Sequence, residues 1–386
     1  MSDTVKTDTL TVLTIWVAGL CAAAQFAKIS VSYQHLGEIY PDAGASLGLA
    51  VSLISFLGVL LGAVAGVLVA GMGYRKVLVI GLTIGALMSL VQSTLPAFPV
   101  FLTSRLLEGI SHLAIVVAAP TLIANVSAPR HHPAVMTLWS CFFGVAYALF
   151  GWGGVPLVEA YGPGRLYLLH GLACIAMAAI LMLVLPKGTV ARSALPKLGE
   201  MLRRHIAIYR SPFTSSAALG WLFYTPTFVA LLTLLPSLAG EGRGGFLVIW
   251  MPLVSIAASL TVGVFMLQRL QAHLVLMIGF AGAAVAVALV WITGSAVGPF
   301  FGLAVFWGLI QGAGFAMVPQ LNDGAGQQSL ANGALAQMGN LGNLCGTPIF
   351  ALILAGGGAE AVYYGLISIF AIAIVLQVVL AKLRAR

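Results

Sequence analysis

The chain is a succession of long apolar runs separated by short polar segments. Each run holds about 18 residues or more, which is enough for a helix to cross a hydrocarbon layer of roughly 30 Å. The pattern therefore predicts an all-α integral membrane protein with about twelve transmembrane helices. The predicted spans are residues 10–34, 47–70, 77–95, 100–124, 134–157, 166–186, 213–237, 246–267, 274–293, 298–320, 332–355 and 361–382.

One longer polar segment divides these runs into two sets of six. We expect an N-terminal bundle over residues 1–186, a cytoplasmic linker over 187–212 and a C-terminal bundle over 213–386. The loop at Gly66–Leu78 and the loop at Gly263–Leu274 occupy matching places in the two sets. Duplicated halves of this kind are typical of transporters that bind their substrate near the midplane. The sequence thus predicts two pseudo-symmetric six-helix bundles.

The predicted linker holds a basic stretch, residues 197–210, with apolar positions at helical spacing. This stretch is either an amphipathic helix on the inner leaflet or a flexible basic linker.

Composition and charge agree with a membrane location. The chain is 60% hydrophobic and only 7% charged, whereas a soluble domain has about 25% charged residues. Most of the 18 basic residues fall on alternate loops, and basic loops stay on the cytoplasmic side. We expect a multi-pass protein of the cell inner membrane with both termini in the cytoplasm.

Several other classes of function are disfavoured. The net charge of +8 is scattered over loops and forms no basic stripe for nucleic acid. Cys21, Cys141, Cys174 and Cys345 lie in apolar runs without disulfide or metal spacing. Nothing resembles a phosphate-binding loop that would use ATP. We therefore expect no cofactor, no bound metal and no enzymatic activity.

The loop between the second and third predicted spans contains a motif. Gly66, Gly73, Arg75 and Lys76 fit the pattern G-x-L-x-D-x-x-G-x-R-K, although Ala70 stands at the aspartate position. This loop resembles the signature of the major facilitator superfamily, and the likeness extends over essentially the whole chain. The resemblance implies a transporter that works by alternating access, with this loop in its gating. Arg75 and Lys76 would also be explained as topology signals alone.

A second motif lies in the fourth predicted span. Arg105, Glu108 and Gly109 are similar to the R-x-x-Q-G of the same family, with glutamate in place of glutamine. The fifth span lacks a Gly-Pro pair in its middle, so the antiporter signature of drug exporters is only half present. This difference favours uptake over efflux.

Charged residues inside membrane spans mark candidate sites because each costs about 2.5 to 3.5 kcal/mol to insert. Lys28, Arg105 and Glu108 lie at similar depths, roughly 8 to 12 Å below the outer surface by helical rise. The resemblance implies that both of their helices line a central cavity. We expect Glu108 to pair with Lys28, Arg105 or both, and the remaining positive charge to attract an anionic or zwitterionic substrate. The alternative is an ion network that only holds the two helices together.

Two residues are candidates for carrying a coupled proton. His112 shares a helix face with Arg105 and Glu108, and a histidine titrates near neutral pH. Glu108 is the rival candidate. His112 would also be explained as a hydrogen-bonded packing residue.

Aromatic and amide side chains are the candidates in the C-terminal half. Trp221 and Tyr224 adjoin Pro226, where we expect a kink, and Trp307 and Gln311 lie in the tenth span. Aromatic faces with amides suit an organic solute better than a bare ion. The tryptophans would alternatively belong to the interfacial belt.

These observations predict a monomeric secondary transporter, a symporter that takes up a small organic anion or zwitterion with protons across the lipid bilayer. The expected partners are the small-molecule substrate, protons and lipid, without nucleic acid. A drug or metabolite exporter of the same fold remains open, as does a membrane sensor that transports nothing.

Overall fold

A computed structural model describes residues 6–385, except residues 129–130, 187–198, 200–205 and 207. The described residues are almost entirely helical, with no strand among them. They group into two compact units, each treated by itself below. The first unit comprises Met1–Ala43 and Leu53–Pro196, and the second comprises Gly44–Ser52 and Lys197–Arg386.

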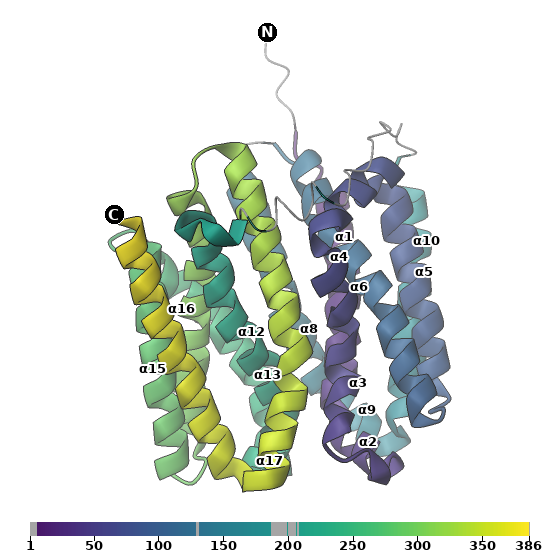
Figure 1. Ribbon diagram of the computed structural model, residues 1–386. Helices are drawn as coiled ribbons and strands as arrows, with labels where there is room; N and C mark the ends of the chain where they lie inside the picture. The colour runs from purple at the N-terminus through teal and green to yellow at the C-terminus, as the bar shows by residue number, and fades with distance from the viewer. Residues whose placement is uncertain (1–5, 129–130, 187–198, 200–205, 207, 386) are drawn as a thin grey trace. The chain divides into compact units, whose positions relative to one another are not determined.

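The first unit is built around five long helices (Figure 1). These are α1 (Thr9–Val31), α4 (Phe56–Met72), α5 (Tyr74–Ser93), α6 (Phe98–Asn125) and α10 (Pro163–Val184). Its short elements are α2 (Tyr33–Ile39), η2 (Leu53–Ser55), α7 (His132–Ser140), α8 (Phe142–Leu149), η4 (Phe150–Gly154) and α9 (Val155–Tyr161). The turn η1 (Pro41–Leu47) begins in this unit and ends in the second.

The second unit contains α3 (Gly48–Ser52), α12 (Pro212–Ala239), α13 (Glu241–Ala258), η5 (Ser259–Gly263), α14 (Val264–Leu267), α15 (Ala272–Ile292), α16 (Val297–Leu321) and α17 (Gly324–Arg384). Helix α17 is broken at Gly358, whose φ of +67° is a left-handed conformation that glycine adopts without strain. Gly358 therefore divides α17 into two membrane-spanning lengths.

The described residues provide eleven segments long and apolar enough to cross a membrane. The last of them, Leu330–Arg384, contains the break at Gly358 and so holds two spans. The prediction of about twelve helices is confirmed. Because most of residues 187–207 lie outside the described part, the expected amphipathic helix of the linker stays a prediction.

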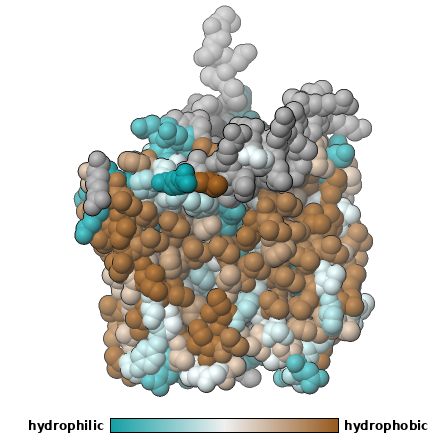
Figure 2. Space-filling model, in the orientation of Figure 1, coloured by the Kyte–Doolittle hydropathy of each residue, from teal (hydrophilic) through white to brown (hydrophobic). Residues whose placement is uncertain are grey.

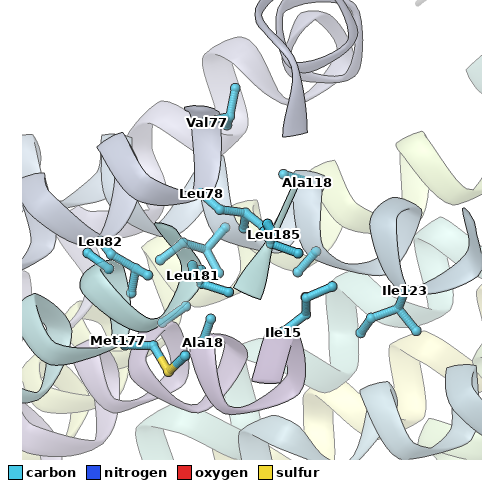
Figure 3. Packing of buried hydrophobic residues seen from close by; sticks show 14 of the residues in the cluster. Ile15, Ala18, Val77, Leu78, Leu82, Ala118, Ile123, Met177, Leu181 and Leu185 are labelled. Carbon is cyan, nitrogen blue, oxygen red and sulfur yellow. The ribbon is translucent and has the colours of Figure 1, made fainter. Parts of the chain in front are cut away.

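The core of the first unit lies where α1, α5, α6 and α10 meet (Figure 3). Ile15, Leu78, Ile123 and Leu181 come from these four helices in turn, and each is fully buried. Lipid tails are as apolar as leucine, so such contacts stabilise the bundle through close van der Waals packing rather than through exclusion of water.

Large apolar side chains also point outward. Leu183 is 87% exposed and Leu352 is 64% exposed. In Figure 2 hydrophobic side chains cover much of the middle of the visible face, and hydrophilic ones gather toward the helix ends. In water so much exposed apolar surface would drive aggregation, whereas in a bilayer it faces lipid.

Small residues allow helices to approach closely at one place in each unit. A Cβ added to Gly109 of α6 would lie 2.5 Å from the carbonyl oxygen of Ile54, in the first unit. A Cβ added to Gly48 of α3 would lie 2.8 Å from Cα of Pro348 in α17, within the second unit. This contact explains why the segment Gly44–Ser52 groups with the second unit.

The close approach at Gly109 predicts that Gly109→Ala destabilises the protein, because the added methyl group meets a backbone oxygen that cannot rotate away. The expected cost is about 1 to 3 kcal/mol, seen as a lower midpoint in thermal unfolding of the purified protein. The matched control is Gly62→Ala in α4, where nothing lies within 4 Å of the added Cβ. Equal midpoints for the two variants would contradict the packing seen here.

Candidate functional site

Three charged side chains meet inside the first unit. Lys28 lies in the last turn of α1, and Arg105 and Glu108 lie one turn apart on α6. Lys28 Nζ is 2.7 Å from Glu108 Oε1, and Arg105 Nη1 contacts Glu108 Oε2. All three side chains are 0% exposed. The expected pairing of Glu108 is thus present with both cations, and the charged cluster, Lys28, Arg105 and Glu108, has a formal charge of +1.

Helix α5 supplies polar groups that complete the hydrogen bonding of this cluster. Lys28 Nζ donates to Ser89 Oγ at 2.6 Å. Gln92 Nε2 donates to Glu108 Oε2 at 2.8 Å and approaches Ser104 Oγ at 3.1 Å. Each carboxylate oxygen of Glu108 therefore accepts a strong bond from a cation, and Oε2 accepts a second from an amide. Such saturation offsets the cost of burying the charge.

Helix α10 brings two further residues that the sequence reasoning did not select. Tyr167 places its ring centre 5.6 Å from Lys28 Nζ, a cation–π contact. His170 Nδ1 lies 2.8 Å from Ser89 Oγ. The available signal was depth, because His170 follows the start of its span by about as many residues as Arg105 and Glu108 follow the start of theirs.

His112 makes its contacts with α1 and not with the charged cluster. Its Nδ1 lies 3.2 Å from the backbone carbonyl oxygen of Ala22. Its ring stands edge to face against Phe26, with centroids 5.1 Å apart. The side chain is only 6% exposed. His112 therefore joins α6 to α1 one turn below the charged cluster, and its hydrogen bond is to backbone.

The aromatic candidates of the second unit form a continuous series. Ring centroids lie 4.9 Å apart for Trp221 and Tyr224, 5.7 Å for Tyr224 and Phe228, and 5.0 Å for Phe228 and Trp307. Trp307 is fully buried, so it is a packed residue and does not belong to an interfacial belt. Gln311 lies one helical turn further along α16.

The buried indole of Trp307 has an unusual feature. Its Nε1 has no hydrogen-bond acceptor among the residues that the structure describes. A buried N–H without an acceptor costs about 1 to 3 kcal/mol, so this donor is a candidate contact for a polar solute.

The loop residues of the sequence motif lie at the junction of α4 and α5. Gly66 is part of α4, and Gly73 ends that helix with a φ of +86°. Arg75 Nη2 donates to the carbonyl oxygen of Met182 at 2.6 Å, near the C-terminal end of α10. A cation at a helix C-terminus satisfies otherwise unpaired carbonyls and complements the helix dipole. Arg75 thus ties α5 to α10. Lys76, in contrast, is exposed.

The fold agrees with the comparison to known families. A model of the Major Facilitator Superfamily matches residues 15–324. The chain belongs to the Major Facilitator Superfamily. No curated protein matches the sequence.

Two solved structures share this Major Facilitator Superfamily fold. Both are of a bacterial homolog to the human lysosomal transporter Spinster. For its inward-facing, occupied conformation the TM-score is 0.70 at 14% identity, covering 98% of this chain and 97% of that chain. For the inward-facing, unoccupied conformation the TM-score is 0.68 at 14% identity, covering 97% and 95%. The protein therefore has the fold of a multi-pass membrane transporter.

The cluster holds two cations and one anion, so neutralising different members should lower the free energy of unfolding by different amounts. Glu108→Gln leaves two buried cations without a counter-ion and is expected to lower the free energy of unfolding by about 3 to 5 kcal/mol. Lys28→Met leaves the balanced pair of Arg105 and Glu108 and is expected to cost less. Adding Lys28→Met to Glu108→Gln should then recover part of the lost stability, measured as the thermal midpoint, because one buried cation instead of two is left without a counter-ion.

The matched control for this comparison is Glu159→Gln, at an exposed position in α9, which should leave the midpoint unchanged. Purely additive effects of Lys28→Met and Glu108→Gln would show that the two side chains do not interact.

Proposed function

We propose that this transporter takes up a small organic anion or zwitterion together with protons, by alternating access across the cell inner membrane. It would act as a monomeric symporter with both termini in the cytoplasm. The observation that carries the proposal is the buried cluster of Lys28, Arg105 and Glu108, in which two cations face one carboxylate.

The excess charge supports an anionic partner. An unbalanced positive charge inside a low-dielectric bundle creates a potential that attracts anions and repels cations. None of the three side chains is exposed, so the cluster acts on a substrate through its net charge. For one of the three side chains to contact the substrate directly, it would first have to release an ion-pair or hydrogen-bond partner. A scaffold of ion pairs would need only equal numbers of each sign, and this cluster has one cation more.

The second unit supports an organic rather than an inorganic solute. Trp221, Tyr224 and Trp307 offer apolar ring faces, and the indole N–H of Trp307 offers a donor without an acceptor. We assign these residues, with Gln311, to the organic part of the substrate. A few polar groups among aromatic side chains are typical of sites for small molecules.

Glu108 and His112 are the proton-binding groups selected by sequence, and Gly66, Gly73, Arg75 and Lys76 form the proposed gating loop. A coupling role for Glu108 is supported by its two ion pairs, because protonation of the carboxylate would remove the charge on which both pairs depend. Arg75 supports a gating role because its bond to Met182 joins two helices at their ends.

The anion proposal predicts that Arg105 contributes to substrate affinity. Purified protein should gain thermal stability from members of a panel of carboxylates, sulfonates and amino acids, since binding to the folded state adds about 2.7 kcal/mol at 100 times the Kd. Arg105→Gln should lose most of this gain, and Arg105→Lys, which keeps the charge, should retain part of it.

Arg165→Gln is the control, because Arg165 of α10 is exposed and its loss should leave the gain unchanged. Full retention of the gain in folded Arg105→Gln would mean that the cluster is a scaffold and does not select the substrate.

The proposed direction of transport predicts the response to a proton uncoupler. Cells producing the protein should accumulate the panel compound with the largest stability gain, and an uncoupler should abolish that accumulation because the proton gradient drives it. Accumulation that rises with the uncoupler would instead identify an exporter. Cells that do not produce the protein provide the background.

A further inference from the structure

A chain of hydrogen bonds leads away from the charged cluster to a histidine outside it. Lys28 Nζ lies 2.6 Å from Ser89 Oγ, and Ser89 Oγ lies 2.8 Å from His170 Nδ1. His170 Nε2 lies 3.0 Å from the carbonyl oxygen of Cys21. The chain thus joins α1, α5 and α10, and Lys28, Ser89 and His170 are all at most 4% exposed.

The chemistry of its two ends fixes the direction of this chain. The Lys28 ammonium can only donate, and the Cys21 carbonyl can only accept. His170 therefore donates from Nε2, and in its neutral form Nδ1 is left to accept. The hydroxyl of Ser89 accepts from Lys28 and donates to His170. Every hydrogen bond of the chain is satisfied when His170 is neutral.

Protonation of His170 would reverse one link. The new Nδ1–H would donate to Ser89, whose hydroxyl hydrogen must then turn to another acceptor. Glu108 Oε1 lies 3.4 Å from Ser89 Oγ and is also the acceptor of Lys28. A rotation of one hydroxyl thus makes Ser89 compete with Lys28 for the same carboxylate oxygen.

The charged and polar groups that face His170 determine which kind of ligand its protonation would favour. Helix α1 presents Lys28 and the backbone of Cys21, and α6 presents Arg105 and Glu108. On α10 itself, Tyr167 flanks Lys28, and Cys174 Sγ lies 3.6 Å from His170 Nε2. From η4 the ring of Phe150 packs edge to face at 6.4 Å. From α5 comes the Ser89 hydroxyl.

Protonation of His170 would raise the formal charge of this group from +1 to +2. Such a charge is stabilised when an anion is bound nearby, and linkage requires the proton to strengthen anion binding by the same factor.

We propose that His170, rather than Glu108 or His112, binds the coupled proton and that the Ser89 hydroxyl transmits its charge state to the ion pair of Lys28 and Glu108. This inference rests on the proposed uptake of an anion. His170 is a positioning residue, because it acts on the pair through Ser89. No bond other than N–H and O–H bonds is made or broken, and the proton enters and leaves at His170 Nδ1.

The first test needs no substrate. Full-length protein labelled with ¹⁵N-histidine, in lipid nanodiscs, is titrated between about pH 5 and pH 8 by NMR, and His170→Gln identifies the His170 signals. The expected neutral form carries its proton on Nε2. Ser89→Ala should change the pH at which His170 charges, whereas Ser93→Ala, whose hydroxyl donates to the carbonyl oxygen of Leu90 in its own helix, should not. A neutral form protonated at Nδ1, or no response to Ser89→Ala, overturns the inference.

The second test measures the coupling. Alkyl sulfonates keep one charge throughout this pH range, so any pH dependence of their binding belongs to the protein. Wild-type protein should bind its best sulfonate at least about fivefold more tightly at pH 5.5 than at pH 7.5, by thermal shift. His170→Gln, which keeps a donor toward Cys21, should bind with equal affinity at both pH values.

The outcomes separate the two proposals. Loss of the pH dependence in His112→Gln but not in His170→Gln overturns the role of His170 alone. If wild-type protein binds the sulfonate equally well at both pH values, the role of His170 is overturned and the proposal of anion binding stands. If no carboxylate, sulfonate or amino acid of the panel binds at either pH, anion transport is refuted and the coupling with it.

Discussion

The first unit depends on one carboxylate. Glu108 lies on α6 and is the counter-ion of two cations, Lys28 from α1 and Arg105 from α6 itself. A charge left alone at this depth costs several kcal/mol, so the register of α1 against α6 is fixed by this cluster more strictly than by apolar packing. Ser89 and Gln92 of α5 extend the constraint to a third helix. Loss of an apolar contact here costs packing, whereas loss of one charge leaves a buried partner charge uncompensated.

The helices and the ion pairs could be predicted from the sequence for different reasons. Long apolar runs determine where spans occur, and helical rise places Lys28, Arg105 and Glu108 at one depth. The sequence does not reveal how each helix is rotated about its axis, because spans that are apolar on every side have no clear inner face. Ser89 and His170 were therefore missed, since their role depends on that rotation. The break at Gly358 was expected only as a short loop between two spans.

The motif loop is a second case in which the sequence identifies a residue but not its partner. Its residues were recognisable, yet the partner of Arg75 was not, because a backbone carbonyl leaves no mark in the sequence. Ala70 replaces the usual acidic residue, and Arg75 bonds to the carbonyl oxygen of Met182 instead. The guanidinium thus joins two helices of one unit, a contact that any side chain at position 182 could provide.

The two units differ in the kinds of polar group that they bury. Among the described residues, the buried charged side chains lie in the first unit, whereas the second contributes aromatic rings and the unpaired indole N–H of Trp307. A saturated ion cluster resists change, since every partner it loses must be replaced. Within it, the bond from Lys28 to Ser89 is the least costly to rearrange, because Ser89 has a second acceptor within reach in Glu108. Any response of the first unit to an arriving charge should therefore begin at Ser89.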